Sequence, residues 1–122
     1  MIGYLTLGTN DLPRAAHFYD DLLALLGAKR AMETERYIGW SAGGPATMLL
    51  LIKPFDGAPA TPGNGTMIAL AAGSREQVAA VHARALALGA RDEGAVGPRG
   101  ESFFGGYFRD LDGNKLAVFT MG

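Results

Sequence analysis

The clearest structural signal in the sequence is the stretch Phe103-Phe104-Gly105-Gly106-Tyr107-Phe108-Arg109-Asp110-Leu111-Asp112-Gly113-Asn114-Lys115-Leu116-Ala117-Val118-Phe119. Aromatic and β-branched residues, which favour strands, lie on both sides of its centre. The central Asp112-Gly113-Asn114 supplies residue types that tolerate positive φ, as a tight turn requires. We therefore expect a β-hairpin here. The rest of the chain reads as a scaffold that builds this hairpin, and a matching earlier segment, into a curved sheet.

The composition limits the classes of protein to consider. The chain has 122 residues, 48% of them hydrophobic, which suits one compact domain with a substantial core. The formal net charge of -1 and the lack of a Lys/Arg run give no sign of a nucleic-acid partner. No apolar run is long enough to span a membrane, and no signal peptide is evident. Cysteine is absent, which excludes disulfides, thiolate metal sites and cysteine nucleophiles. We expect a soluble, cytoplasmic protein.

The first half of the chain predicts a strand, a helix and three further strands. Residues 2–9 alternate between apolar and polar side chains, as a half-buried strand does. Asp11 is a good N-cap for a helix that we expect to end near Leu26, where Gly27 follows. The remaining strands are expected at residues 29–33, 36–42 and 46–52.

The same order of elements returns after residues 54–65, whose three Pro and three Gly indicate a linker. A strand is expected at 67–71, and a capping-box pattern from Ser74 to Gln77 opens a second helix. The halves superpose with a shift of 63 residues before the helix and 62 after it, which indicates an internal duplication. We expect a single domain over 1–122, with one module at about 1–53 and a second at about 66–122.

Two sequence motifs accompany this duplication. They are Leu5-Thr6-Leu7-Gly8-Thr9-Asn10-Asp11-Leu12 with His17-Phe18-Tyr19, and Arg109-Asp110-Leu111-Asp112-Gly113-Asn114-Lys115-Leu116. Together these features resemble the vicinal oxygen chelate superfamily, which includes glyoxalase, bleomycin-resistance proteins and extradiol dioxygenases. The resemblance covers essentially the whole chain. It implies an α+β fold of tandem βαβββ modules that form an incomplete barrel around a cleft, and it implies a homodimer.

Enzymes of this superfamily usually bind one divalent metal with His, Gln or Glu side chains on four strands. Carried over one at a time, these positions fall on Tyr4, Met67, Ala117 and either Met48 or Leu50. None of these residue types suits a hard divalent ion. The only two histidines, His17 and His82, belong to the predicted helices, where we expect them to be solvated or to cap. We therefore expect no metal and no cofactor.

Strand alternation predicts which side chains face the cleft. If Leu5 and Leu7 pack under a helix, Tyr4 and Thr6 face the other way. The predicted cleft-lining set is Tyr4, Trp40, Met48, Leu50, Met67, Tyr107, Arg109, Lys115, Ala117 and Phe119. This set is apolar and aromatic with a few polar tips, as small-molecule pockets often are. Tyr4, as a weak acid, and Arg109, as a carboxylate holder, are the candidate catalytic residues.

Several of these residues have an equally ordinary structural interpretation. Met48 and Met67 could fill a core, Trp40 could pack under a helix, and Arg109 could pair with a nearby acid such as Asp110, Asp112 or Glu101. The favoured function is metal-free binding of a small organic molecule. An alternative is a lyase, isomerase or dioxygenase with an atypical or metal-free site. A third is a cleft filled by side chains, in a protein that acts through its dimer surface.

Overall fold

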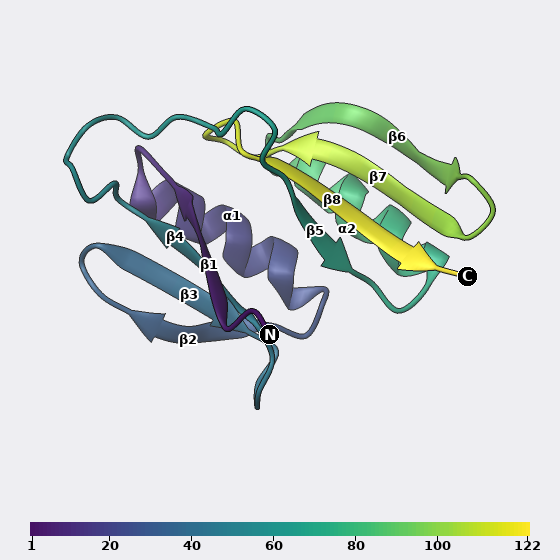
Figure 1. The fold of residues 1–122 in the computed structure, drawn as a ribbon, viewed down its shortest axis with the longest axis horizontal. Coiled ribbons are helices and arrows are strands. Elements are labelled where there is room, and N and C mark those ends of the chain that lie inside the picture. The colour runs from purple at the N-terminus through teal and green to yellow at the C-terminus, as the bar shows by residue number, and fades with distance from the viewer. The chain divides into compact units, whose positions relative to one another are not determined.

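A computed structural model describes all 122 residues, which divide into two compact units, Met1–Thr61 and Pro62–Gly122. Each unit is one βαβββ module (Figure 1). The first contains β1 (Tyr4–Gly8), α1 (Leu12–Ala24), β2 (Lys29–Glu33), β3 (Tyr37–Ser41) and β4 (Met48–Ile52). The second contains β5 (Ile68–Ala71), α2 (Arg75–Ala87), β6 (Arg91–Arg99), β7 (Phe103–Arg109) and β8 (Lys115–Met121). The predicted α+β class and the tandem βαβββ modules are confirmed. Neither helix is long and apolar enough to cross a membrane.

The first module has a four-stranded sheet in the order β1-β4-β3-β2, with β1 parallel to β4 and the other pairs antiparallel. Helix α1 packs against β2, β3 and β4. Three leucines of β1 and β4 are buried: Leu7, Leu49 and Leu51. The residues that alternate with them along these strands point to the opposite face of the sheet. The core of the module therefore lies between α1 and one face of the sheet. Helix α1 does not cover the other face.

Helix α1 begins where the sequence predicts. The Asp11 carboxylate accepts a hydrogen bond from the Arg14 amide at 3.1 Å, which satisfies one of the donors that a helix start leaves unpaired. The helix ends at Ala24, two residues before the predicted Leu26. The Ala28 amide donates to the Leu23 carbonyl at 3.0 Å, and Gly27 adopts a left-handed φ of 77°. The chain therefore leaves the helix through a glycine cap of the kind expected.

Trp40 is a correction to the predicted cleft-lining set. Its side chain is only 1% exposed and packs near the ring of Tyr19 of α1, with the centroids 5.8 Å apart. Its indole Nε1 donates a hydrogen bond to Asp20 Oδ1 at 2.9 Å. Trp40 pairs with Leu49 across β3 and β4, and Leu49 is buried with the core. Trp40 therefore packs under α1 and not in a ligand pocket.

Asp20 should give the stability of the protein a pH dependence. Its carboxylate accepts hydrogen bonds from Arg30 at 2.9 and 2.8 Å, and these, with the indole of Trp40, lower the pKa of Asp20 below its usual value. A lowered pKa stabilises the fold above the unfolded-state pKa, and this stability is lost as the pH falls through the folded-state pKa. We expect urea unfolding to show that the stability advantage of the wild type over Asp20→Asn shrinks as the pH falls from neutral through the acid range. An advantage that is the same at every pH would contradict this.

The second module repeats the arrangement, with a sheet in the order β5-β8-β7-β6 and β5 parallel to β8. Helix α2 packs against β6, β7 and β8. The Ser74 hydroxyl accepts from the Gln77 amide at 3.1 Å, as the capping pattern predicts. The Gln77 side chain accepts from the amide of Gly73, at 2.6 Å, and so reaches back one residue further than a standard capping box.

His82 is a second correction, because it is neither solvated nor a cap. This residue of α2 is 7% exposed, and its Nε2 lies 3.2 Å from both Asp92 Oδ1 and the Tyr107 carbonyl oxygen. A Cβ on Gly106 of β7 would lie 3.0 Å from the imidazole Cδ2. The absence of a side chain at Gly106 therefore leaves space for the imidazole ring. Because His82 is buried as well, the buried face of α2 is wider than its apolar residues alone suggest.

The turn between β7 and β8 is held by Asp110, which is buried. Its Oδ1 accepts from the amides of Asp112 and Asn114, both at 2.9 Å, and its Oδ2 accepts from the Asn114 side chain at 3.0 Å. Gly113 adopts a positive φ of 88°, while its two neighbours do not. Because the turn is fixed, Arg109 and Lys115 lie opposite each other across the two strands.

Candidate functional site

The first module carries a pocket of about 340 Å³ on its sheet. The residues that line it are Tyr4, Thr6, Met32, Tyr37, Met48, Leu50 and Ile52. Along β1 and β4 these residues alternate with the buried Leu7, Leu49 and Leu51. The pocket therefore lies on the face of the sheet that α1 does not cover.

Register explains how β1 and β4 build this pocket. The two strands run parallel, and their paired residues include Tyr4 with Met48 and Thr6 with Leu50. Side chains directly opposite each other on one face of a sheet lie close enough to form a continuous surface. The predicted residues Tyr4, Met48 and Leu50 are thus brought together by adjacent pairs.

Gly39 of β3 gives the pocket its depth. A Cβ at this position would lie 2.8 Å from Met48 Sδ and 3.1 Å from carbon atoms of both Leu50 and Met32. A side chain here would therefore occupy the space between the three residues. Glycine within a strand commonly marks such a close approach.

Four residues of this pocket are absent from the predicted set, although strand alternation already places Thr6 on the same face as Tyr4. Ile52 continues the alternation of β4 and could have been found by extending the same pattern. Tyr37 faces Ile52 across β3 and β4, which only the strand register reveals. Met32 follows an irregularity in β2, where the register shifts between Arg30 and Met32, and such a bulge leaves no clear sequence signal.

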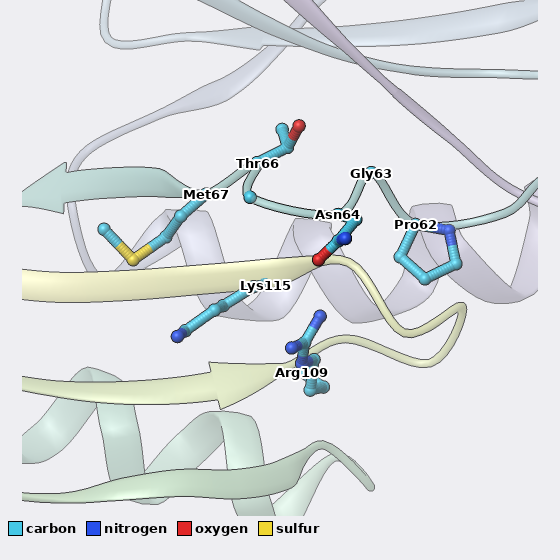
Figure 2. A pocket seen from close by; sticks show the side chains of 8 residues that line it. Pro62, Gly63, Asn64, Thr66, Met67, Arg109 and Lys115 are labelled. Atoms are coloured by element: carbon cyan, nitrogen blue, oxygen red, sulfur yellow. The ribbon is translucent and has the colours of Figure 1, made fainter.

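The second module carries a pocket of about 570 Å³ between a loop and the ends of two strands. Its lining consists of Pro62, Gly63, Asn64, Gly65, Thr66, Met67, Arg109 and Lys115 (Figure 2). Met67, Arg109 and Lys115 belong to the predicted set, whereas residues 62–65 of the loop are predicted to be only a linker. The two candidate catalytic residues therefore lie in different pockets, Tyr4 in the first module and Arg109 in the second.

Arg109 pairs with an acid other than those expected from the sequence. Its Nε donates to Glu93 Oε1 at 2.7 Å, and its Nη1 donates to the Gly113 carbonyl at 3.1 Å. The hydrogen bond from Arg109 lowers the pKa of Glu93, with smaller electrostatic contributions from Arg91 and Lys115. Glu93 is thus ionised at neutral pH and offsets one of the local positive charges.

The remaining predicted residues of the second module, Tyr107, Ala117 and Phe119, line neither pocket. Ala117 is fully buried. Phe119 stacks on Phe103 with the ring centroids 5.2 Å apart. The ring of Tyr107 lies beneath two cations, with Arg99 Cζ 5.5 Å and Lys115 Nζ 5.6 Å from its centroid. These three residues therefore make packing contacts within the sheet.

The residues at the positions of the superfamily's metal ligands do not fit a divalent ion. In the first module, Tyr4 and its partner Met48 offer a phenol and a thioether. In the second, Met67 and Ala117 offer a thioether and a methyl group. Hard cations prefer carboxylate and carbonyl oxygen, and the borderline metals prefer imidazole or thiolate. No group of three or more His, Cys, Asp or Glu side chains gathers in the chain.

Comparison with solved structures supports the fold described above. A glyoxalase/bleomycin resistance protein from Albidiferax ferrireducens is 34% identical, with a TM-score of 0.92 over 100% of this chain and 99% of that chain. A lactoylglutathione lyase from Agrobacterium tumefaciens is 22% identical, with a TM-score of 0.71 over 98% of this chain and 92% of that one. The latter identity shows a shared fold only.

A third structure, a glyoxalase/bleomycin resistance protein/dioxygenase family enzyme from Burkholderia phytofirmans, is 15% identical. Its TM-score is 0.78, with 98% of each chain covered. None of the curated proteins compared with the chain matches it. The family model described as the Glyoxalase/Bleomycin resistance protein/Dioxygenase superfamily matches residues 1–118. The chain therefore belongs to the glyoxalase/bleomycin resistance protein/dioxygenase superfamily.

Proposed function

We propose that the protein binds a small, largely apolar organic molecule with an aromatic ring in the pocket of the first module. The observation that carries this proposal is the lining of that pocket, which combines two tyrosines and two methionines with aliphatic side chains around about 340 Å³. Pockets of this size and composition suit small organic ligands. The proposal includes a homodimer, as the sequence resemblance implies, and a cytoplasmic location, as the composition leads us to expect, and it uses no metal.

The side chains of this pocket have complementary roles in such binding. Tyr4 is 65% exposed and its ring offers a stacking surface, and the thioethers of Met32 and Met48 adapt to irregular shapes. The hydroxyls of Tyr4, Thr6 and Tyr37 make no hydrogen bond within the chain. They can therefore orient one or two polar groups of a bound molecule.

A fluorescence titration tests the proposal with the neutral probe N-phenyl-1-naphthylamine, which brightens in apolar surroundings. We expect saturable binding to the wild type. Tyr4→Ala should weaken this binding about tenfold, because an aromatic side chain that contacts a ligand typically contributes about 1–2 kcal/mol. The fold should persist, since Tyr4 is largely exposed.

Phe55→Ala is the matched control, because Phe55 is also an exposed aromatic residue of the first module but does not line the pocket. It should bind the probe as the wild type does. Failure of the wild type to bind, or equal weakening by both substitutions, would show that the pocket is not the ligand site.

A further inference from the structure

We propose that the pocket of the second module binds a small organic oxyanion, either a carboxylate or a phosphate, between the loop at residues 62–67 and the ends of β7 and β8. This site is made entirely by residues of the second module. It does not depend on the apolar pocket proposed above, and either proposal can fail without the other.

The geometry brings cationic and amide groups into one space (Figure 2). The Asn64 side chain points from the loop toward Arg109, whose guanidinium points back toward the loop. Lys115 extends from β8 along the sheet beneath Met67. The pocket of about 570 Å³ has room for the carbon skeleton of a ligand beside its anionic group.

Arg109 is held in place and still has donors to offer. One N–H is used on Glu93 and one on the Gly113 carbonyl. A guanidinium carries five N–H groups, so three are left without a partner in the chain. An arginine that is fixed by two hydrogen bonds loses little freedom when it binds an anion, and its planar donor array matches carboxylate and phosphate oxygens.

Lys115 supplies the positive charge that is not offset. Its ammonium makes no salt bridge and lies 5.6 Å from the centre of the Tyr107 ring. Glu93 is the acid paired with Arg109, so that pair is neutral as a whole. The lysine then leaves the lining of the pocket with a net positive charge, which favours an anion over a cation or a neutral molecule.

The loop adds neutral donors to the same pocket. The Thr66 amide closes a turn by donating to the Gly63 carbonyl at 3.2 Å. The amides of Gly63, Asn64 and Gly65 make no hydrogen bond within the chain. Successive free backbone amides in a turn are a common way of binding anions. Residues that carry three kinds of donor, Arg109, Lys115 and those of the loop, therefore line one pocket.

Amide-detected NMR titrations test the site with three probes of similar shape: benzoate, phenyl phosphate and the neutral benzamide. We expect benzoate or phenyl phosphate to shift the amide signals of Asn64, Gly65 and Thr66, and benzamide to leave them in place. The stronger of the two anions identifies the ligand as a carboxylate or a phosphate. Equal binding of benzamide, shifts confined to other residues, or no shift with either anion would overturn the proposal.

Substitutions at Lys115 separate a role in binding from a role in folding. Lys115→Met should weaken binding of the anion about tenfold, as loss of a charged hydrogen-bond donor does, whereas Lys115→Arg should largely restore it. Lys29→Met, at an exposed lysine of the first module that lines neither of the two pockets described above, should leave the affinity unchanged. If Lys115→Met unfolds the chain, Lys115→Gln provides the same test. Wild-type affinity in a folded Lys115 variant that lacks the charge would overturn the proposal.

Discussion

Replacing Trp40 with alanine should lower the free energy of unfolding by about 3–5 kcal/mol, as truncation of a large buried aromatic residue does. Trp40 is buried between β3 and α1, where it packs near Tyr19 and donates a hydrogen bond to Asp20. Alanine would leave a cavity at this contact and remove one of the donors to the Asp20 carboxylate. Urea unfolding, monitored by circular dichroism, measures the effect.

Two further variants sharpen this prediction. Trp40→Phe keeps most of the packing but loses the indole N–H, so it should cost only about 1–2 kcal/mol. Phe55→Ala removes an aromatic side chain that is 92% exposed and should change stability by less than about 0.5 kcal/mol. If Trp40→Ala were no more costly than Phe55→Ala, the helix-facing position of the indole would be wrong.

The second large effect is expected at Asp110, where alanine should destabilise the protein by about 3 kcal/mol. The carboxylate is buried and accepts three hydrogen bonds from the turn that joins β7 to β8. Its removal takes away the acceptor of these three hydrogen bonds. Buried donors without a partner are costly because they have lost their hydrogen bonds to water.

Controls for Asp110 follow from the same contacts. Asp110→Asn retains one oxygen that can accept from the amides of Asp112 and Asn114, but its NH₂ group then faces the NH₂ group of Asn114. This variant should therefore lower the free energy of unfolding about half as much as Asp110→Ala does. Asp56→Ala, at an exposed aspartate that accepts one amide hydrogen bond, should cost about 0.5 kcal/mol or less. Chemical denaturation of all three variants measures the order of their losses in free energy of unfolding. Equal losses for Asp110→Ala and Asp56→Ala would contradict the structural role of the turn.

Asp110 also connects stability to the second pocket. It lies next to Arg109, and its partner Asn114 lies next to Lys115. Asp110→Ala should therefore weaken binding of the anion even at temperatures where the variant stays folded, because the two cationic side chains lose their fixed separation. Positioning by a rigid turn is a common requirement of binding sites built on strand ends.

Much of the fold could be read from the sequence because its local signals agree with one another. The duplicated order of elements, Asp11 and Ser74 as helix caps, and the turn around Gly113 each have a direct physical cause. The end of α1 was placed two residues too late, because Leu25 and Leu26 continue the apolar pattern after the helical hydrogen bonds have ended.

The candidate sites were harder to predict because side-chain direction depends on strand register. Alternation along a strand correctly places Tyr4 and Thr6 on one face of the sheet. It cannot tell which residues of a neighbouring strand point to that same face. Trp40 was assigned to the wrong face for this reason. The burial of His82 is not predictable from its helix alone, because the space that it occupies is made by Gly106, 24 residues later in the chain.

The loop at residues 62–67 shows another limit of composition. Its residues 62–65 belong to the segment that proline and glycine content predicts to be a linker, and residues 62–67 form neither helix nor strand before β5. Nothing in that composition shows that the loop packs near Arg109 and Lys115 to form a pocket. Function in this superfamily fold therefore has to be argued from the residues of each site and not from the scaffold.

Ligand binding in the pocket of the first module can be located by an NMR titration of protein labelled with ¹³C at its methionine methyl groups, with N-phenyl-1-naphthylamine as the ligand. The chain has five methionines, and two of them, Met32 and Met48, line the pocket of the first module. We predict that the signals of these two methyl groups shift most and saturate together with the probe's fluorescence. Shifts confined to Met1, Met67 and Met121, or no shift at saturation, would contradict a ligand site in this pocket.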